Sequence, residues 1–209
     1  MADIMKTERL LLFPSSPRLA PAVAAYFVRN REFLRPFEPI REKSFFTVQG
    51  QRRLLRQEER DMAVGSGYRF WMIPKAPPAA VIGSVALVNV VRGSFQGAAV
   101  SYRADKDHVN SGYVTEALAR LVAFAFRTLG LHRLEANIMP RNKPSLRVVE
   151  KLGFSREGLA RAYLNINGVW EDHVQMAIIN AAFPGRVGST TKPWCPTGTN
   201  RSSAPASTP

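Results

Sequence analysis

Residues 105–118, DKDHVNSGYVTEAL, join a predicted strand to a predicted helix. The strand lies before this stretch, at residues 95–103, where β-branched and aromatic side chains favour extended backbone. The helix follows over residues 113–129, because its apolar residues recur at i, i+3, i+4, i+7, i+8 and i+11, which is the spacing of one helix face. These apolar residues are Leu118, Leu121, Val122, Ala125, Phe126 and Leu129. A strand, a loop of small residues and an amphipathic helix therefore follow one another at the centre of the chain.

Further strands and helices are predicted on both sides of this unit. Strands are expected at residues 8–13, 68–73, 81–90 and 133–139, and two more flank the hairpin signal Asn167-Gly168. Helices are expected at about 47–63 and about 143–152, with another helical stretch before residue 47. Short loops between the strands at 68–103 predict an antiparallel meander. The chain is therefore predicted to form an α+β domain around a mixed sheet.

The composition predicts one globular domain with a basic surface. Of the 209 residues, 45% are hydrophobic and 22% are charged, which is enough apolar material for a core. There are 29 Lys and Arg against 16 Asp and Glu, and the net charge of +13 favours negatively charged partners. We expect the domain to span residues 1–183, followed by a flexible tail at 184–209 that is rich in Pro, Ser and Thr.

Neither a membrane segment nor a metal centre is expected. The N-terminus lacks the basic start and apolar run of a secretory signal, and the most apolar long window, around 118–126, is interrupted by an arginine. We therefore predict a cytoplasmic protein with no membrane partner. The single cysteine, Cys195, excludes an intramolecular disulfide, and its place in the tail argues against a catalytic thiol. The three histidines are far apart in the sequence, which argues against a metal site.

The loop before the helix at 113–129 supports two interpretations. Ser111 and Gly112 have small side chains, so a ligand can approach the backbone, and the free amides and positive dipole at a helix N-terminus attract phosphate. Alternatively, Ser111 caps the helix, Gly112 only makes the turn, and Glu116 complements the helix dipole. The local sequence leaves both interpretations open.

The order of strand, small-residue loop, amphipathic helix, strand, Asn-x-x-Ser, helix and Leu-Gly-Phe resembles the GNAT superfamily of acetyl-CoA-dependent N-acetyltransferases. Seven segments resemble its RimJ type, the ribosomal-protein alanine N-acetyltransferases, and the resemblance covers roughly residues 6–180. These segments are Asn30-Arg31-Glu32-Phe33-Leu34, Glu38-Pro39, Val91-Arg92-Gly93-Ser94-Phe95, His132-Arg133, Met139-Pro140-Arg141-Asn142-Lys143, Leu152-Gly153-Phe154 and Asn167-Gly168-x-Trp170-x-Asp172-His173. The resemblance implies a mixed, mostly antiparallel central sheet flanked by helices.

The resemblance also implies where acetyl-CoA binds. Its pyrophosphate would contact the backbone amides of the loop, and its pantetheine arm would pair with the preceding strand. The loop residues are Asn110, Ser111, Gly112, Tyr113 and Val114, and the strand residues are Ala99, Val100, Ser101, Tyr102 and Arg103. The family's loop pattern falls on Val109, Gly112 and Val114, and only the central glycine is kept. Backbone amides remain available despite this departure.

Catalytic residues follow from the same resemblance. Asn142 corresponds to the family asparagine that binds pantetheine, and Ser145 would protonate the departing thiolate, because the usual tyrosine position is Val149. The alternative role of Ser145 is to satisfy a backbone N–H at the start of its helix. The usual glutamate base position is Asn137. Glu135 on the same strand face, Asn137 acting through water, or no dedicated base are all open, since an α-amino group has a reference pKa of about 7.7 to 8.0.

The implied activity is acetylation of the N-terminal alanine of a ribosomal protein. Phe33, Arg35, Phe37 and Arg92 are the predicted acceptor-binding residues, although the first three also suit a helix that covers the core with a solvated face. The basic charge would suit contact with ribosomal RNA. Alternatives are another amine acceptor, such as a polyamine, an aminoglycoside or an unrelated peptide, and a non-enzymatic protein that binds the ribosome or RNA with the same fold.

Overall fold

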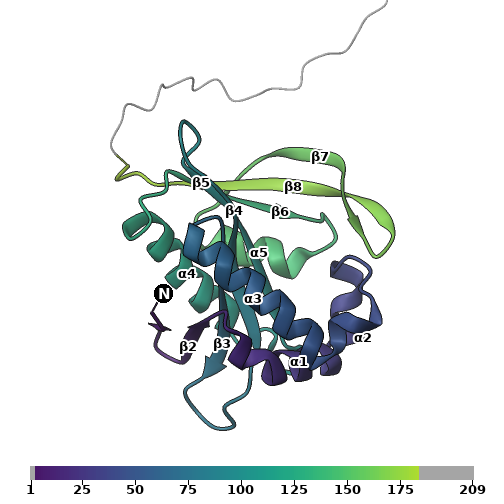
Figure 1. Cartoon of the computed structure of the whole chain (residues 1–209). Helices are drawn as coiled ribbons and strands as arrows, with labels where there is room; N and C mark the ends of the chain where they lie inside the picture. The colour runs from purple at the N-terminus through teal and green to yellow at the C-terminus, as the bar shows by residue number, and fades with distance from the viewer. Residues whose placement is uncertain (1–2, 184–209) are drawn as a thin grey trace, which may run out of the picture.

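The computed structural model describes residues 3–183, and Figure 1 shows their arrangement. The predicted tail, residues 184–209 with Cys195, lies outside the described residues, so its flexibility stays a prediction. No helix in the described part of the chain is long and apolar enough to cross a membrane.

Eight strands form one mixed sheet in the order β1-β2-β3-β4-β5-β6-β8-β7. Neighbouring strands are antiparallel except β5 and β6, which run parallel. The strands are β1 (Met5–Lys6), β2 (Leu10–Pro14), β3 (Tyr68–Pro74), β4 (Gly83–Val91), β5 (Gly97–Ala104), β6 (Arg133–Ile138), β7 (Ser155–Ile166) and β8 (Val169–Ile179). The predicted α+β fold with a mostly antiparallel sheet is confirmed, as is the meander β3-β4-β5.

Five α-helices accompany the sheet within residues 3–183: α1 (Ala20–Arg29), α2 (Arg31–Leu34), α3 (Val48–Val64), α4 (Tyr113–Arg127) and α5 (Lys143–Lys151). Local chemistry sets several of their ends. The Thr47 side chain accepts a hydrogen bond from the Gly50 amide and begins α3, and Gly65 ends this helix with a φ of 76°, which favours glycine.

Helices cover both faces of the sheet and enclose two apolar cores (Figure 1). On one face, Leu118, Leu121 and Ala125 of α4 and Val149 of α5 pack against the sheet. On the other face, α1 and α3 enclose Tyr26, Phe27, Leu55 and Trp71. Side chains of a strand alternate between these two faces, so one central strand can present residues to both.

Candidate active site

The central parallel strands separate partway along their length. β5 pairs with β6 only from Gly97↔Arg133 to Ala99↔Glu135, although β5 continues to Ala104 and β6 to Ile138. Ala99 is therefore still inside the ladder, whereas Val100 to Arg103 lie beyond it. Backbone groups on this side of β5 are open to an extended ligand, which can pair with them like an added strand.

The loop after β5 ends at an uncapped helix. Gly112 occupies the N-cap position of α4 with a φ of 78°, and no side chain accepts a hydrogen bond from the first turn. The Ser111 hydroxyl instead donates to the Val109 carbonyl at 3.3 Å. The prediction that Ser111 caps this helix is therefore wrong, because its hydroxyl is engaged within the loop. The first amides of α4 remain as an anion-binding group.

Arg9 holds this loop from the start of the chain. Its Nη1 donates to the Ser111 carbonyl at 2.9 Å, its Nε donates to Glu116 at 2.6 Å, and its backbone amide donates to the same carboxylate at 2.8 Å. The guanidinium lies 4.5 Å from the centre of the Tyr113 ring. A positive charge thus stands beside the free amides of α4, and Glu116 serves this contact as well as the helix dipole.

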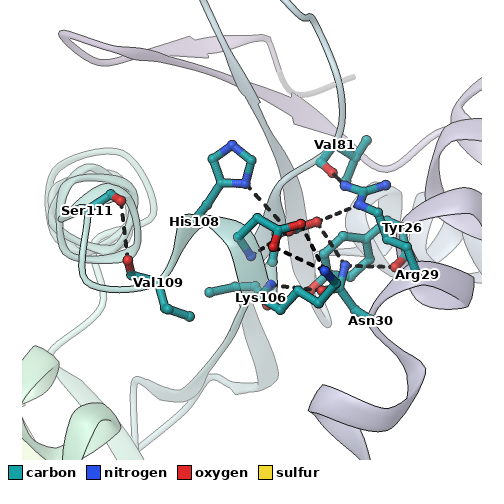
Figure 2. A network of polar contacts seen from close by, with 11 residues as sticks. Tyr26, Arg29, Asn30, Val81, Lys106, His108, Val109 and Ser111 are labelled. Atoms are coloured by element: carbon teal, nitrogen blue, oxygen red, sulfur yellow. Dashed lines mark hydrogen bonds and ion pairs between the residues drawn. The ribbon is translucent and has the colours of Figure 1, made fainter.

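The other side of the loop is fixed by a buried polar network on Asp105, which is 1% exposed. Figure 2 shows Arg29 and Asn30 reaching from the end of α1 to the segment that carries Lys106 and His108. The Asp105 carboxylate accepts hydrogen bonds from Arg29 Nε at 2.6 Å and from Asn30 Nδ2 at 2.9 Å. Asn30 Oδ1 accepts from the Lys106 amide at 2.8 Å.

These contacts keep Asp105 charged. Burial alone raises the pKa of this carboxyl, but hydrogen bonds from Asn30, the Asp107 amide and Arg29 bring it below its ordinary value. The Asp107 amide donates to the same carboxylate at 3.0 Å, so the backbone entering the loop is bound directly. The start of the loop between β5 and α4 is therefore attached to the end of α1.

An Asn30→Ala variant is expected to raise KM for acetyl-CoA about tenfold with kcat nearly unchanged. The substitution removes the hydrogen bonds of Asn30 to the Lys106 amide and to the buried Asp105 carboxylate, and a buried polar group that loses its partner costs about 1–3 kcal/mol, so the loop loses its fixed position. Asn180→Ala is the matched control. The Asn180 side chain makes two hydrogen bonds, with Leu131 and Ala182, at the opposite end of the sheet, against three for the Asn30 side chain. Steady-state kinetics that show equal KM values in both variants would contradict this role.

On the face that packs against α5, Asn142, Ser145 and Tyr102 come together. Asn142 is the N-cap of α5, and its Oδ1 accepts from the Ser145 amide at 3.3 Å. The alternative in which Ser145 performs the capping is wrong, because Asn142 occupies that role. The Ser145 hydroxyl instead lies 2.6 Å from the Tyr102 hydroxyl. The Ser145 hydroxyl thus contacts a side chain from the part of β5 that lies beyond its pairing with β6.

The candidate bases lie on the other face of β6. Glu135 and Asn137 alternate with the core residues Leu134, Ala136 and Ile138, so their placement on one face is confirmed. Glu135 accepts a hydrogen bond from Arg133 Nε at 2.7 Å and sits where β5 and β6 are still paired. Asn137 lies two residues further along, at the level where the strands have separated. The gap between β5 and β6 beyond their paired residues, called the opening below, is therefore closer to Asn137 than to Glu135.

The segment after α2, which includes Pro36, Phe37, Glu38 and Arg41, forms a wall over the face of the sheet that carries Glu135 and Asn137. Glu38 receives hydrogen bonds from Arg103 of β5 and from Arg41, and its carbonyl accepts from the Asn167 amide in the β7–β8 turn at 2.9 Å. Burial alone raises the pKa of the Glu38 carboxyl, but the charge of Arg103 and its hydrogen bond bring it below its ordinary value. Arg141 donates to the Pro36 carbonyl at 3.0 Å. Three separate elements therefore hold this wall.

A cavity of about 350 Å³ lies beside this wall. Its charged lining consists of three arginines and two glutamates: Arg31, Arg35, Arg41, Glu32 and Glu38. Glu38 is paired with Arg41 at 3.0 Å, whereas Glu32 is exposed and lies 3.6 Å from Arg35. The apolar rings of Phe27, Phe45 and Phe46 also line the cavity. The cavity can accept a small apolar group, and arginines outnumber glutamates in its lining.

The predicted acceptor residues do not all meet here. Arg35 lines the cavity, and Phe37 lies in the wall with its ring 5.9 Å from the Arg141 guanidinium. Phe33 is 37% exposed on α2. Arg92 lies at the other end of β5, where its Nη1 donates to the Leu129 carbonyl at 2.8 Å. Arg92 does not lie with the other three predicted residues, because about seven residues of strand, roughly 20 Å, separate it from the wall.

The histidines stay apart, as their positions in the sequence suggest. His108 lies beside the Asp105 carboxylate, and His132 packs against Phe183. His173 is buried on β8 with Nδ1 3.0 Å from the Glu171 carbonyl. Within residues 3–183, no three His, Cys, Asp or Glu side chains are placed to hold a metal ion.

The chain belongs to the GNAT acetyltransferases, because the family model described as an acetyltransferase (GNAT) domain matches residues 9–155. It is an acetyl-CoA-dependent N-acetyltransferase of the RimJ type. It is 43% identical over 151 residues to the probable N-acetyltransferase YjcK of Bacillus subtilis (strain 168), covering 72% of this chain and 83% of the relative.

Two further relatives carry more specific descriptions. The chain is 35% identical over 183 residues to the ribosomal protein uS5-alanine N-acetyltransferase of Escherichia coli (strain K12), covering 87% of this chain and 94% of the relative. RimJ of Mycobacterium smegmatis, solved in complex with CoA-disulfide, has the same fold with a TM-score of 0.80 and 26% identity, covering 87% of this chain and 89% of that chain. The resemblance drawn from the sequence is confirmed.

Several residues of the site escaped the sequence analysis. Arg9 and Glu116 are 107 positions apart, and Asn30 and Asp105 are 75 apart, so no local pattern joins them. Asn30 and Glu38 do stand in segments that carry the family resemblance, which was the available signal. Tyr102 was predicted only for its backbone on the edge of β5, whereas its side-chain hydroxyl also contacts the Ser145 hydroxyl.

Proposed function

We propose that the protein acetylates the N-terminal alanine of a ribosomal protein, with acetyl-CoA as the donor. The observation that carries this proposal is the 35% identity, over 94% of its length, to an enzyme described as acting on the alanine of ribosomal protein uS5. The cavity supports it independently, because arginines outnumber glutamates in its lining and Glu38 is paired with Arg41. A polycationic acceptor such as a polyamine or an aminoglycoside would need free carboxylates there.

The donor would occupy the groups left open around β5. Its pyrophosphate fits the amides of Asn110 to Val114 beside Arg9, and its pantetheine arm fits the free edge of β5 from Val100 to Arg103. Asn142 uses Oδ1 as a helix cap, so its Nδ2 is the atom that would donate to a pantetheine carbonyl. Acetyl-CoA supplies an acetyl group on a thiolate leaving group.

The residues around the opening would then position the acceptor and assist departure of the thiolate. An amine reaching the thioester carbon from the side of Asn137 forms the C–N bond, and the C–S bond breaks toward Ser145. Most of the rate acceleration would come from holding the two reactants in contact. Ser145 would donate to the thiolate, and proton removal from the amine would involve Asn137 through water, Glu135 or solvent alone.

Among residues 3–183, neither candidate base on β6 is a free strong base, which favours an α-amino acceptor. Glu135 is already paired with Arg133, and Asn137 does not titrate. An α-ammonium has a reference pKa of about 7.7 to 8.0, against about 10.4 for lysine, so a larger neutral fraction is available at neutral pH. This difference corresponds to a population advantage of more than a hundredfold for the α-amine.

A peptide that begins with Ala is therefore expected to be acetylated on its α-amino group. The same peptide blocked at its N-terminus, but containing lysine, should remain unmodified. Mass spectrometry of both products after incubation with acetyl-CoA measures the preference. Faster acetylation of the lysine side chain or of a polyamine would overturn the proposed acceptor and leave the acetyl-CoA assignment intact.

Contact with ribosomal RNA forms part of the proposal, supported by a row of exposed arginines on α3. Arg52, Arg56 and Arg60 recur every four residues, so they lie on one helix face about 6 Å apart. Regularly spaced guanidinium groups suit a phosphate backbone. A cytoplasmic location stays a prediction.

Neutral substitutions in this row should slow acetylation of ribosome-bound substrate and leave a short peptide unaffected. We expect the triple variant Arg52→Gln, Arg56→Gln, Arg60→Gln to lose most of the salt dependence of turnover on ribosomal subunits, because salt competes with phosphate contacts. The double variant Arg127→Gln, Arg147→Gln removes exposed arginines from the opposite face and is the control. Equal salt dependence in all three proteins would remove the RNA contact from the proposal.

A further inference from the structure

Tyr102 makes a side-chain contact that its role in the β5 edge does not require. β5 alternates between the two faces of the sheet, and Tyr102 points toward α5 together with the core residues Ala98 and Val100. Its hydroxyl lies 2.6 Å from Ser145 Oγ and 3.0 Å from the Ser145 carbonyl oxygen, so its single proton faces two acceptors, of which Oγ is the nearer. The contact connects β5 to the first turn of α5.

The hydroxyls of Tyr102 and Ser145 can each donate one hydrogen bond. A serine hydroxyl has one proton and two lone pairs, and so does a tyrosine hydroxyl. If Tyr102 donates to Ser145 Oγ, the proton of Ser145 is free to point into the opening between β5 and β6. Without that donor, a serine in the first turn of a helix turns its proton toward a nearby backbone carbonyl.

Tyr102 remains a neutral donor under ordinary conditions. Burial raises the pKa of Tyr102 to about 12, although its hydrogen bond to Ser145 acts in the opposite direction. Its hydroxyl is therefore protonated from pH 6 to pH 10. A tyrosine in this state makes a poor acid by itself and a steady hydrogen-bond donor.

We propose that Tyr102 is a positioning residue that donates to Ser145 Oγ and thereby aims the Ser145 proton at the departing thiolate. This inference rests on the proposed role of Ser145 in acetyl transfer. As the amine adds to the thioester carbon and the C–S bond breaks, the sulfur receives a hydrogen bond from Ser145, and Tyr102 compensates the charge drawn from Ser145 Oγ. The amine releases its excess proton to water, and the departing thiolate takes up one proton to become the thiol, so no further reactant is required.

Tyr102 supplies a phenol hydroxyl that α5 itself lacks. Residue 149 on α5, where the resemblance places a tyrosine, is the buried Val149, which is part of the apolar core. Tyr102 reaches the same helix from β5 instead. The phenol and the serine together offer a donor at the opening, although neither occupies the tyrosine position.

A double-mutant cycle of Tyr102→Phe and Ser145→Ala tests this inference. Tyr102→Phe keeps the ring and removes only the hydroxyl, and we expect kcat to fall about fivefold to tenfold while KM for acetyl-CoA stays within twofold. In the Ser145→Ala background, Tyr102→Phe should have no further effect, because its target is gone. The ratio of wild-type to Tyr102→Phe kcat should be constant from pH 6 to pH 10.

Control measurements separate this inference from the proposed function. Tyr68→Phe removes a tyrosine hydroxyl on β3, whose ring packs against Phe124, and should leave kcat unchanged. The cycle is measured on the Ala-initiated peptide and on slow hydrolysis of acetyl-CoA without acceptor, which expels the same thiolate. Failure of peptide acetylation alone would overturn the acceptor and leave the hydrolysis cycle to test Tyr102.

Two results would overturn the role of Tyr102. One is a Tyr102→Phe variant, folded by circular dichroism, with wild-type kcat in both reactions. The other is multiplicative losses in the double variant, which would mean that the two hydroxyls act independently. A kcat ratio that changes with pH would show that Tyr102 itself titrates, which also contradicts the positioning role.

Discussion

A Gly112→Glu variant is expected to lose measurable binding of acetyl-CoA while it stays folded. Gly112 begins α4 at a φ of 78°, and a Cβ atom there would lie 3.2 Å from Arg9 Nη2. A glutamate at this position would place a carboxylate at the amides that are proposed to bind pyrophosphate and would pair with Arg9 in its place. Isothermal titration with CoA measures the loss directly.

Gly93→Glu is a closely matched control for this variant. Gly93 has a φ of 71°, so the backbone strain of a side chain is similar, roughly 1–2 kcal/mol at either position. Its Cβ would meet no atom within 4 Å, and it lies in the β4–β5 turn, away from the start of α4. Unchanged CoA affinity in a folded Gly112→Glu protein would refute the proposed phosphate site.

A Ser145→Ala variant is expected to have a kcat about a hundredfold lower, with KM for acetyl-CoA nearly unchanged. A positioned donor for the departing thiolate is typically worth ~10²-fold or more, and it acts in the transition state rather than in binding. The variant should fold normally, because the cap of α5 is the Asn142 side chain and accepts from the backbone amide of residue 145. Thermal unfolding checks this point.

One outcome would contradict the proposed role of Ser145 as donor to the thiolate. A folded Ser145→Ala protein with wild-type kcat in steady-state assays would mean that water protonates the thiolate. Ser155→Ala, at the exposed start of β7, is expected to leave kcat unchanged and controls for the loss of a hydroxyl in general.

Much of the fold was predictable because its signals are local. The stripe of Leu118, Leu121 and Ala125 gave the buried face of α4, and the helix predicted at 143–152 corresponds to α5 at Lys143–Lys151. Glu135 and Asn137 share a face because strand side chains alternate. Periodicity and turn residues are short-range properties, so one sequence is enough to recognise them.

The site depended more on contacts between distant segments. Arg9 beside Ser111, Asn30 on Asp105 and Glu38 on Arg103 join residues that are 65 to 102 positions apart, and no local rule predicts such pairs. Arg92 was assigned to the acceptor side from a shared family segment, but such a segment does not specify which end of the sheet it occupies. The Ser111 cap failed for a similar reason, because the hydroxyl found a carbonyl within its own loop.

The most direct test of the proposed activity is mass spectrometry of protein N-termini in matched cells with and without this chain. Removal of the gene is expected to convert the N-terminal alanine of one ribosomal protein from acetylated to free, and restoring the wild-type chain, but not Gly112→Glu, should recover the modification. Unchanged acetylation of every ribosomal protein N-terminus, together with loss of acetyl groups from lysines or from a small amine, would contradict the proposed function.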